Sequence, residues 1–145
     1  MKSPTEQLSA AVFDRAQQPR NYGAIRPCDG HAMTTGACGD TIEFWIRVRE
    51  GRIVAIGFTT TGCGTSRAAG SMATELALGK TLEEAEEIDE VDVEEALDGL
   101  PAASRHCALL ATDTLLTAIG DALGRSVLNE WLEEHRTEPK TAKSR

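Results

Sequence analysis

Three cysteines of this 145-residue chain lie at boundaries between stretches whose sequence patterns predict different secondary structure. Cys38 lies in a glycine-flanked turn just before an alternating, strand-like stretch. Cys63 lies between two glycines, at the point where the strand-like pattern gives way to a helical one, and Cys107 lies in the first turn of a long helical stretch. Free N–H groups and the macrodipole at a helix N-terminus favour a thiolate. The positions of Cys63 and Cys107 therefore predict thiols that ionise readily.

Asp40 and His106 stand beside these cysteines in the sequence. If the three junctions converge at one end of a sheet, they bring together three sulfurs, one carboxylate and one imidazole. That set suits tetrahedral Zn²⁺, and it equally suits a two-iron cluster, which takes four protein ligands that are usually thiolates. Because an oxygen ligand is harder and suits cluster iron less well, such a site should hold a cluster loosely. Loose binding is what a protein that gives its cluster away requires.

Each of these residues also has an ordinary structural interpretation. A single free cysteine is often a small buried hydrophobic residue, and no two of the cysteines form a Cys-x-x-Cys pair. Cys28 and His31 make one Cys-x-x-His pair, which alone does not predict a metal site. A nucleophilic enzyme that uses Cys107 with His106 as its base is disfavoured, because adjacent helical side chains point about 100° apart.

The composition excludes several classes of protein. The chain has 15 Lys and Arg against 23 Asp and Glu, a net charge of −8, so nucleic-acid binding is not expected. At 41% hydrophobic residues it can bury a core, which excludes extensive disorder. Neither an apolar run of about 20 residues nor a signal-peptide core is apparent in the sequence. We therefore expect a cytoplasmic protein without a membrane segment, whose cysteines are reduced thiols.

The acidic residues are concentrated in one segment. Residues 83–98 hold ten acidic side chains and no basic one. One interpretation is a solvated helical surface with good capping residues. The other is a docking surface for a basic partner, which neutralising Glu86, Glu87, Glu90 and Glu94 would test.

The periodicity predicts one α+β domain, with a small antiparallel sheet followed by helices. A first helix is expected from Ser3, which forms a capping box with Glu6, to Gln18, before Pro19. The strands are expected at 41–61, a hairpin with its turn at Glu50-Gly51, and more weakly at 31–36. Further helices are expected after Gly64, Thr81 and Ser104, from Asp92 to Gly99, and after Ser126. The residues expected to be buried include Val54, Ile56 and Phe58 in the second strand of the hairpin, and Leu109, Leu116, Ile119 and Leu123 in the long helix.

Five motifs, in order along the chain, resemble those of a known family. They are Gln18–Gly23, Ala37–Asp40, Thr61–Thr65, the stretch from Thr74 to Ala85, and Asp98–Pro101 with His106-Cys107. Together they are similar to the iron–sulfur cluster scaffolds IscU and the N-terminal domain of NifU. The resemblance covers about residues 8–123. It implies an IscU/SufE-like α+β fold with a three-stranded sheet and about five helices. The scaffold domain would be residues 1–124, followed by a C-terminal helix and polar tail at 125–145.

The resemblance also implies a function and a set of site residues. Such a scaffold is not an enzyme: it receives Fe²⁺ and sulfur, assembles a transient [2Fe-2S] cluster, and passes it to apo-proteins. The ligands would be Cys38, Cys63 and Cys107, with Asp40 or His106 as the fourth. Cys107 would accept persulfide sulfur from a cysteine desulfurase, and an electron donor such as ferredoxin would supply electrons. The protein would be a monomer or a homodimer.

Two departures from the family pattern qualify this reading. Leu100–Ser104 lacks the second proline and the lysine of the segment that an Hsp70-type chaperone reads, so chaperone-driven release is not expected. Arg67 stands in a stretch that is more apolar in the family, where it would contact a partner or an anion. The alternative to a scaffold is a SufU-type protein that holds zinc and accepts sulfur without housing a cluster. That branch has an insertion before its last cysteine and lacks the preceding histidine, so the compact 63–107 segment and His106 favour the scaffold.

Overall fold

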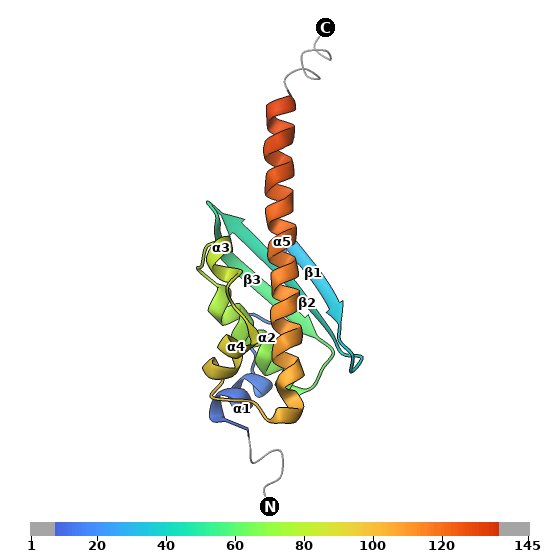
Figure 1. Ribbon diagram of the computed structural model, residues 1–145, viewed down its shortest axis with the longest axis vertical. Helices are drawn as coiled ribbons and strands as arrows, with labels where there is room; N and C mark the ends of the chain where they lie inside the picture. Colours follow the sequence, from blue (N-terminus) through green and yellow to red (C-terminus); the bar gives the residue numbers. More distant parts are fainter. Residues whose placement is uncertain (1–7, 137–145) are drawn as a thin grey trace, which may run out of the picture.

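Three antiparallel strands form a single sheet in the order β1-β2-β3, and the long helix α5 crosses one face of it (Figure 1). The computed structural model describes residues 8–136. The strands are β1 (Gly30–Thr35), β2 (Thr41–Arg49) and β3 (Arg52–Thr60). Both strands of the predicted hairpin and the weaker third strand are therefore present. The α+β fold class predicted from the sequence is confirmed.

The hairpin turn and a bulge set which side chains of β3 face the core. Glu50 and Gly51 both have positive φ, 53° and 77°, as a tight hairpin turn requires. Arg47 pairs with Ala55 and Val48 with Ile53, so Val54 is an extra residue on β3. A bulge of this kind interrupts the alternation of side chains. The prediction that Val54 is buried is therefore wrong, since Ile53 is buried in its place and Val54 is exposed.

Helix α1 (Ala10–Gln17) begins with Ser9, whose side chain accepts a hydrogen bond from the Val12 N–H. The predicted start at Ser3 lies outside the described residues, whereas the end before Pro19 is as predicted. The helix packs on α2 (Gly64–Ala77) and is joined to it by a two-point contact. Arg15 Nε and Nη2 each lie 2.8 Å from a different carboxylate oxygen of Glu75.

The acidic segment forms two short helices, α3 (Leu82–Ala85) and α4 (Glu90–Ala96). The Thr81 capping box is present as predicted. Helix α4 begins earlier than predicted, because Asp89 is its N-cap and Asp92 completes a second capping box with it. A 3₁₀ turn (Ala102–Ser104) then leads into α5 (Arg105–His135).

Helix α5 continues without a break for 31 residues. The separate last helix predicted to open at Ser126 is therefore wrong. The Gly124-Arg125-Ser126 sequence contains no proline, and glycine and serine weaken a helix without ending it. The predicted division of the chain at residue 124 stays a prediction, and it lies inside this helix.

Small side chains on α5 face the sheet. The buried residues of its first half include Ala108, Ala111, Leu115, Ala118, Ile119 and Ala122. A Cβ at Gly30 would collide with the Ala118 carbonyl, so helix and strand backbones are in direct contact. The predicted burial of Ile119 is confirmed, but Leu109 and Leu116 are exposed. Those two predictions are wrong because the buried face is marked mainly by alanines, and Leu109 and Leu116 lie off it.

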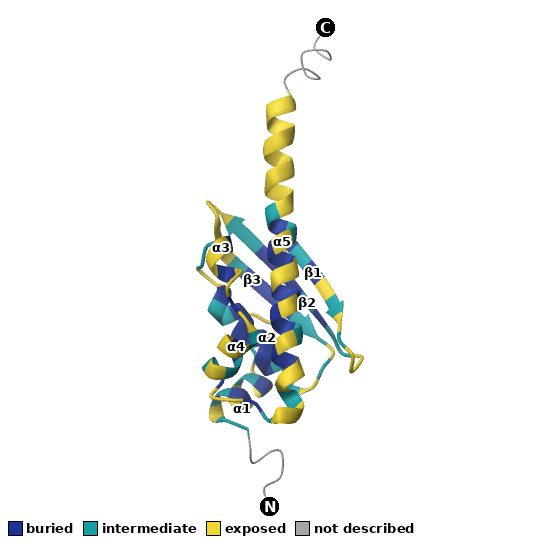
Figure 2. Ribbon diagram, in the orientation of Figure 1, coloured by how far each residue is buried: buried dark blue, intermediate teal, exposed yellow. Residues whose placement is uncertain are grey.

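The stretch Ala102–His135 is long and apolar enough to cross a membrane, judged by length and composition alone. Half of its most apolar window is buried inside the protein. Figure 2 shows that the buried part is the half that lies on the sheet. We therefore describe the first half of α5 as a core helix of this domain.

Candidate functional site

Two of the three predicted cysteine ligands are joined by one hydroxyl group. Thr65 Oγ1 lies 3.1 Å from Cys63 Sγ and 3.5 Å from Cys107 Sγ. Ser66 Oγ lies 3.5 Å from the same Cys107 sulfur. Cys63 is the exposed N-cap residue of α2, while Cys107, in the first turn of α5, is only 4% exposed. The start of α2 therefore brings these two cysteines together.

Cys38 and Asp40 form a second pair in the turn between β1 and β2. The Cys38 thiol lies 3.5 Å from Asp40 Oδ2, in an orientation in which the thiol donates. The same carboxylate oxygen would lie 3.0 Å from a Cβ at Gly62, which would also collide with the Ser66 side chain. Only glycine fits at position 62, and its small size lets Asp40 approach the start of α2.

His106 lies beside both groups. Its Nε2 is 3.7 Å from Cys107 Sγ. His106 and Cys38 also line one pocket of about 600 Å³, whose apolar wall includes Leu109 and Leu110. All five residues predicted from the sequence thus lie around the N-termini of α2 and α5 and the turn before β2.

The five side chains do not yet form a closed coordination sphere. In residues 8–136, no three His, Cys, Asp or Glu side chains lie close enough together to hold a metal ion. The structure instead shows a Cys63–Thr65–Cys107 group and a Cys38–Asp40 pair. The side chains have to rotate before the Cys63–Thr65–Cys107 group and the Cys38–Asp40 pair could bind the same metal ion or cluster.

The pKa of the Cys63 thiol lies below its ordinary value. The main cause is the hydrogen bond with the Thr65 side chain, and backbone N–H groups at the start of α2 add to it, while partial burial opposes it. This agrees with the expectation for a cysteine at a helix N-terminus. Cys63 is thus prepared to be a thiolate, the form in which cysteine binds metals and attacks sulfur.

Sequence analysis predicted a helix after Gly64 but did not predict the contacts of Thr65 and Ser66 with sulfur. In the structure Cys63 is the N-cap, and neither hydroxyl caps the helix. Side chains in the first turn of a helix point back toward its N-terminus. Hydroxyls two and three residues after a cysteine at such a position were the signal available in the sequence.

The loop after α1 holds α2 against the sheet. Asn21, at φ 60°, donates its amide N–H to Thr74 Oγ1 at 2.9 Å, and the Gly23 N–H donates to the Phe58 carbonyl at 2.7 Å. Arg67, predicted to contact a partner or an anion, donates to the Ala16 carbonyl at 2.9 Å. These contacts position α2, whose first turn carries the site.

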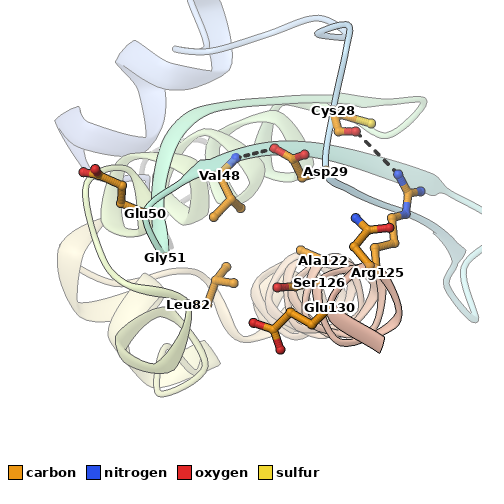
Figure 3. A pocket seen from close by; sticks show the side chains of 11 residues that line it. Cys28, Asp29, Val48, Glu50, Gly51, Leu82, Ala122, Arg125, Ser126 and Glu130 are labelled. Carbon is orange, nitrogen blue, oxygen red and sulfur yellow. Dashed lines mark hydrogen bonds between the residues drawn. The ribbon is translucent and has the colours of Figure 1, made fainter. Parts of the chain in front are cut away.

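Cys28 lies away from the other cysteines. It lines a different pocket, near the β2–β3 turn and the middle of α5 (Figure 3). His31, its partner in the Cys-x-x-His spacing, is 2.6 Å from Glu43. Nothing in the structure gives Cys28 a share in the candidate site.

The sequence matches the family described as "NifU-like N terminal domain" over residues 7–128. The chain belongs to this family. Among curated proteins it is 49% identical to the iron–sulfur cluster assembly scaffold protein IscU 1 of Archaeoglobus fulgidus over 115 residues, covering 78% of this chain and 74% of that one. It is 40% identical to the corresponding IscU of Escherichia coli over 118 residues, covering 78% of this chain and 91% of that one. The resemblance stated from the motifs is confirmed.

Solved structures agree on the fold. A nitrogen-fixing NifU-like protein (N-terminal) from Brucella abortus superposes with a TM-score of 0.65 at 17% identity, covering 84% of this chain and 99% of that one. FiSufU of Fervidobacterium islandicum superposes with a TM-score of 0.63 at 22% identity, covering 77% and 95%. At these identities the likeness supports the fold alone, so it does not separate a cluster scaffold from a SufU-type protein.

Proposed function

We propose that this protein is an iron–sulfur cluster assembly scaffold that holds a [2Fe-2S] cluster and passes it to apo-proteins. The observation that carries the proposal is the meeting of cysteine sulfurs at one end of a fold whose relatives are named IscU scaffolds. The ligands are Cys38, Cys63 and Cys107, and the fourth is Asp40 or His106. Three thiolates with a harder or neutral fourth ligand hold iron less tightly than four thiolates, which suits transfer.

The positions of the side chains support a particular order of events. Cys63, with its lowered pKa and exposed sulfur, is the first ligand for Fe²⁺. The Cys107 thiolate attacks the outer sulfur of a persulfide on a cysteine desulfurase, the S–S bond breaks, and the desulfurase cysteine leaves as a thiolate. Cys107 is buried, and its neighbour His106, 3.7 Å from its sulfur, shares a pocket with the exposed Cys38, so we infer that the persulfide approaches from that side.

The electrons balance with one added reductant. Two persulfide sulfurs need four electrons to become the two sulfides of the cluster. Two Fe²⁺ ions supply two of these electrons as they become Fe³⁺, and a donor such as ferredoxin supplies the other two. The scaffold is regenerated when the cluster leaves, and it has no substrate turnover of its own.

Anaerobic reconstitution with Fe²⁺, cysteine and a desulfurase tests this proposal. We expect the wild-type chain and Cys28→Ser to gain the visible absorption and Mössbauer signals of a [2Fe-2S] cluster. Cys28 is the matched control because it is a free cysteine outside the site. Serine at position 38, 63 or 107 should prevent or greatly weaken cluster formation. A colourless product that contains only zinc and still accepts sulfur would overturn the scaffold in favour of the SufU-type alternative.

The persulfide step has its own test. Cys107→Ser should abolish sulfur transfer from the desulfurase, measured as the mass increase of one sulfur atom on the chain. Undiminished uptake would move the acceptor role to Cys38 or Cys63.

A further inference from the structure

The second half of α5 leaves the domain and is exposed around its circumference (Figure 2). Its exposed apolar residues are Val127, Leu128, Trp131 and Leu132. No residue in the described range 8–136 covers them. Exposed apolar surface of this extent marks a site of interaction.

The apolar side of α5 changes as the helix leaves the domain. In the first half most of the apolar residues face the sheet. In the second half that same side carries Arg125, Ser126 and Glu130, which line a pocket of about 540 Å³ with the β2–β3 turn (Figure 3).

The exposed apolar and glycine residues follow one another at helical spacing along the opposite side, which we call the outer stripe. Its members are Leu109, Leu116, Gly120, Gly124, Val127, Leu128 and Trp131. Folding of the helix end onto the described part of its own domain would bury the polar side and leave the outer stripe uncovered.

We propose that the outer stripe from Gly120 onward binds a second copy of this chain. The two α5 helices pack antiparallel about a twofold axis that passes between Val127 and Leu128. In such an isologous contact each surface is its own complement. The inference concerns assembly alone and does not rest on the proposed function.

Side-chain size favours the antiparallel order. About this axis Gly124 lies level with Trp131 of the second copy, and Gly120 lies level with its His135. The rings of Trp131 and His135 stack with centroids 4.1 Å apart, which makes one bulky unit. A Cβ at either glycine would meet nothing within 4 Å, so both present open surface to receive that unit. A parallel pair would place Trp131 against itself.

Charge favours the same order. Glu130, Glu133 and Glu134 all lie in the last turns of α5, and Arg125 lies one and a half turns earlier. A parallel pair would set the three glutamates level with their own copies. The antiparallel pair sets Glu130 level with Arg125 of the second copy. Glu134 is then level with Asp121, but Asp121 is already paired with Arg125 of its own chain, so fewer like charges meet than in the parallel order.

This arrangement keeps the two candidate sites apart. Each domain lies on the inner side of its own α5, so the two domains fall on opposite sides of the helix pair. The two Cys107 residues are then separated by about 60 Å along the helix axis, from a rise of about 1.5 Å per residue. Each protomer would therefore carry its cluster independently.

Sedimentation velocity of the full chain from 1 to 200 µM tests the dimer. We expect a dimer in the wild-type protein and at least a tenfold weaker association in Val127→Glu, which places two carboxylates next to the axis. The matched control is Met33→Glu, an apolar residue of similar exposure on β1, 61% against 64%. It should associate like wild type. A wild-type monomer at 200 µM, or equal weakening by both variants, would overturn the proposal.

Disulfide mapping tests the orientation. In the antiparallel pair two cysteines introduced by Val127→Cys meet near the axis, whereas two introduced by Gly124→Cys lie about 10 Å apart along it. A disulfide needs Cα atoms within about 7 Å, so only the first variant should form its symmetrical cross-link on oxidation. Mass spectrometry of tryptic peptides distinguishes this cross-link from any disulfide that the four native cysteines form. Symmetrical cross-links in both variants, or at position 124 alone, would overturn the antiparallel order.

Discussion

Replacing Thr65 by valine removes the hydroxyl that lies between Cys63 and Cys107. Valine keeps the branched shape, so the start of α2 should be preserved. The Thr65 side chain is the main cause of the lowered pKa of Cys63, so the variant should raise that pKa. Serine at position 65 keeps the hydroxyl and is the matched control.

The size of the effect follows from two opposing terms. A hydrogen bond to a charged group contributes about 1.5–3 kcal/mol, and because Cys63 is exposed we take about 1 kcal/mol, with water replacing the remainder. Since about 1.4 kcal/mol corresponds to tenfold, the thiolate fraction at neutral pH should fall about fivefold. A more basic thiolate is more nucleophilic, with a Brønsted coefficient of about 0.4–0.5, which regains about half of the loss on a logarithmic scale. Alkylation of Cys63 should therefore slow only about twofold near neutral pH.

The rate profile, and not a single rate, is the decisive measurement. Iodoacetamide labelling of Cys63, followed by peptide mass spectrometry from pH 6 to 10, should show two curves that cross. Thr65→Val should be slower than wild type at low pH and about twofold faster once both thiols are fully ionised. Thr65→Ser should follow wild type. Coincident profiles for valine and wild type, or a serine variant that behaves like valine, would refute the reasoning.

Two further predictions concern charged side chains. Asp40→Ala should retain its cluster longer, because Asp40 is either the weak oxygen ligand or a group that assists release. Transfer to apo-ferredoxin should slow about tenfold, the equivalent of one charge-assisted contact. Equal or faster transfer, followed by visible absorption, would contradict a role of Asp40 in release. Burial raises the pKa of Glu75, but hydrogen bonds from Arg15 and Ser71 outweigh it and hold that pKa below its ordinary value. The stabilisation is therefore complete above the ordinary glutamate pKa of about 4.3 and is lost as the pH falls through the lower folded value. Glu75→Gln should cost about 1 kcal/mol in urea unfolding at neutral pH and progressively less as the pH falls below about 4. A cost that did not change with pH would count against the ion pair.

The sequence predicted the elements of the sheet and the first half of the chain well, because their signals are local. Glycine at a tight turn, proline after α1 and the Thr81 capping box each act within a few residues. The exposure of Val54 was not predictable in this way, because the bulge that causes it depends on how β3 pairs with β2. The true length of α5 was also missed, since the glycine and serine near residue 125 are common both at helix ends and inside long helices.

The candidate site was likewise predictable only in part from the sequence. The cysteines, Asp40 and His106 were identifiable from motifs, and the sequence placed them at element junctions. The sulfur contacts of Thr65 and Ser66 depend on the approach of α5 to the start of α2. That approach is set by alanines on α5 and glycines at the layer contacts, and no local pattern reports it.

The hydrogens on Thr65, Ser66 and Cys38 determine which of the three sulfurs accept a hydrogen bond and which donate one. A hydroxyl carries one hydrogen, so Thr65 can donate to only one of the two sulfurs at a time. Ser66 supplies a second hydrogen beside Cys107, which leaves the Thr65 hydrogen for Cys63. An ionised carboxylate only accepts, so the hydrogen between Cys38 and Asp40 belongs to the thiol itself. An arriving metal ion therefore has to turn a hydroxyl aside at Cys63, whereas at Cys38 it meets a thiol whose hydrogen is directed at Asp40.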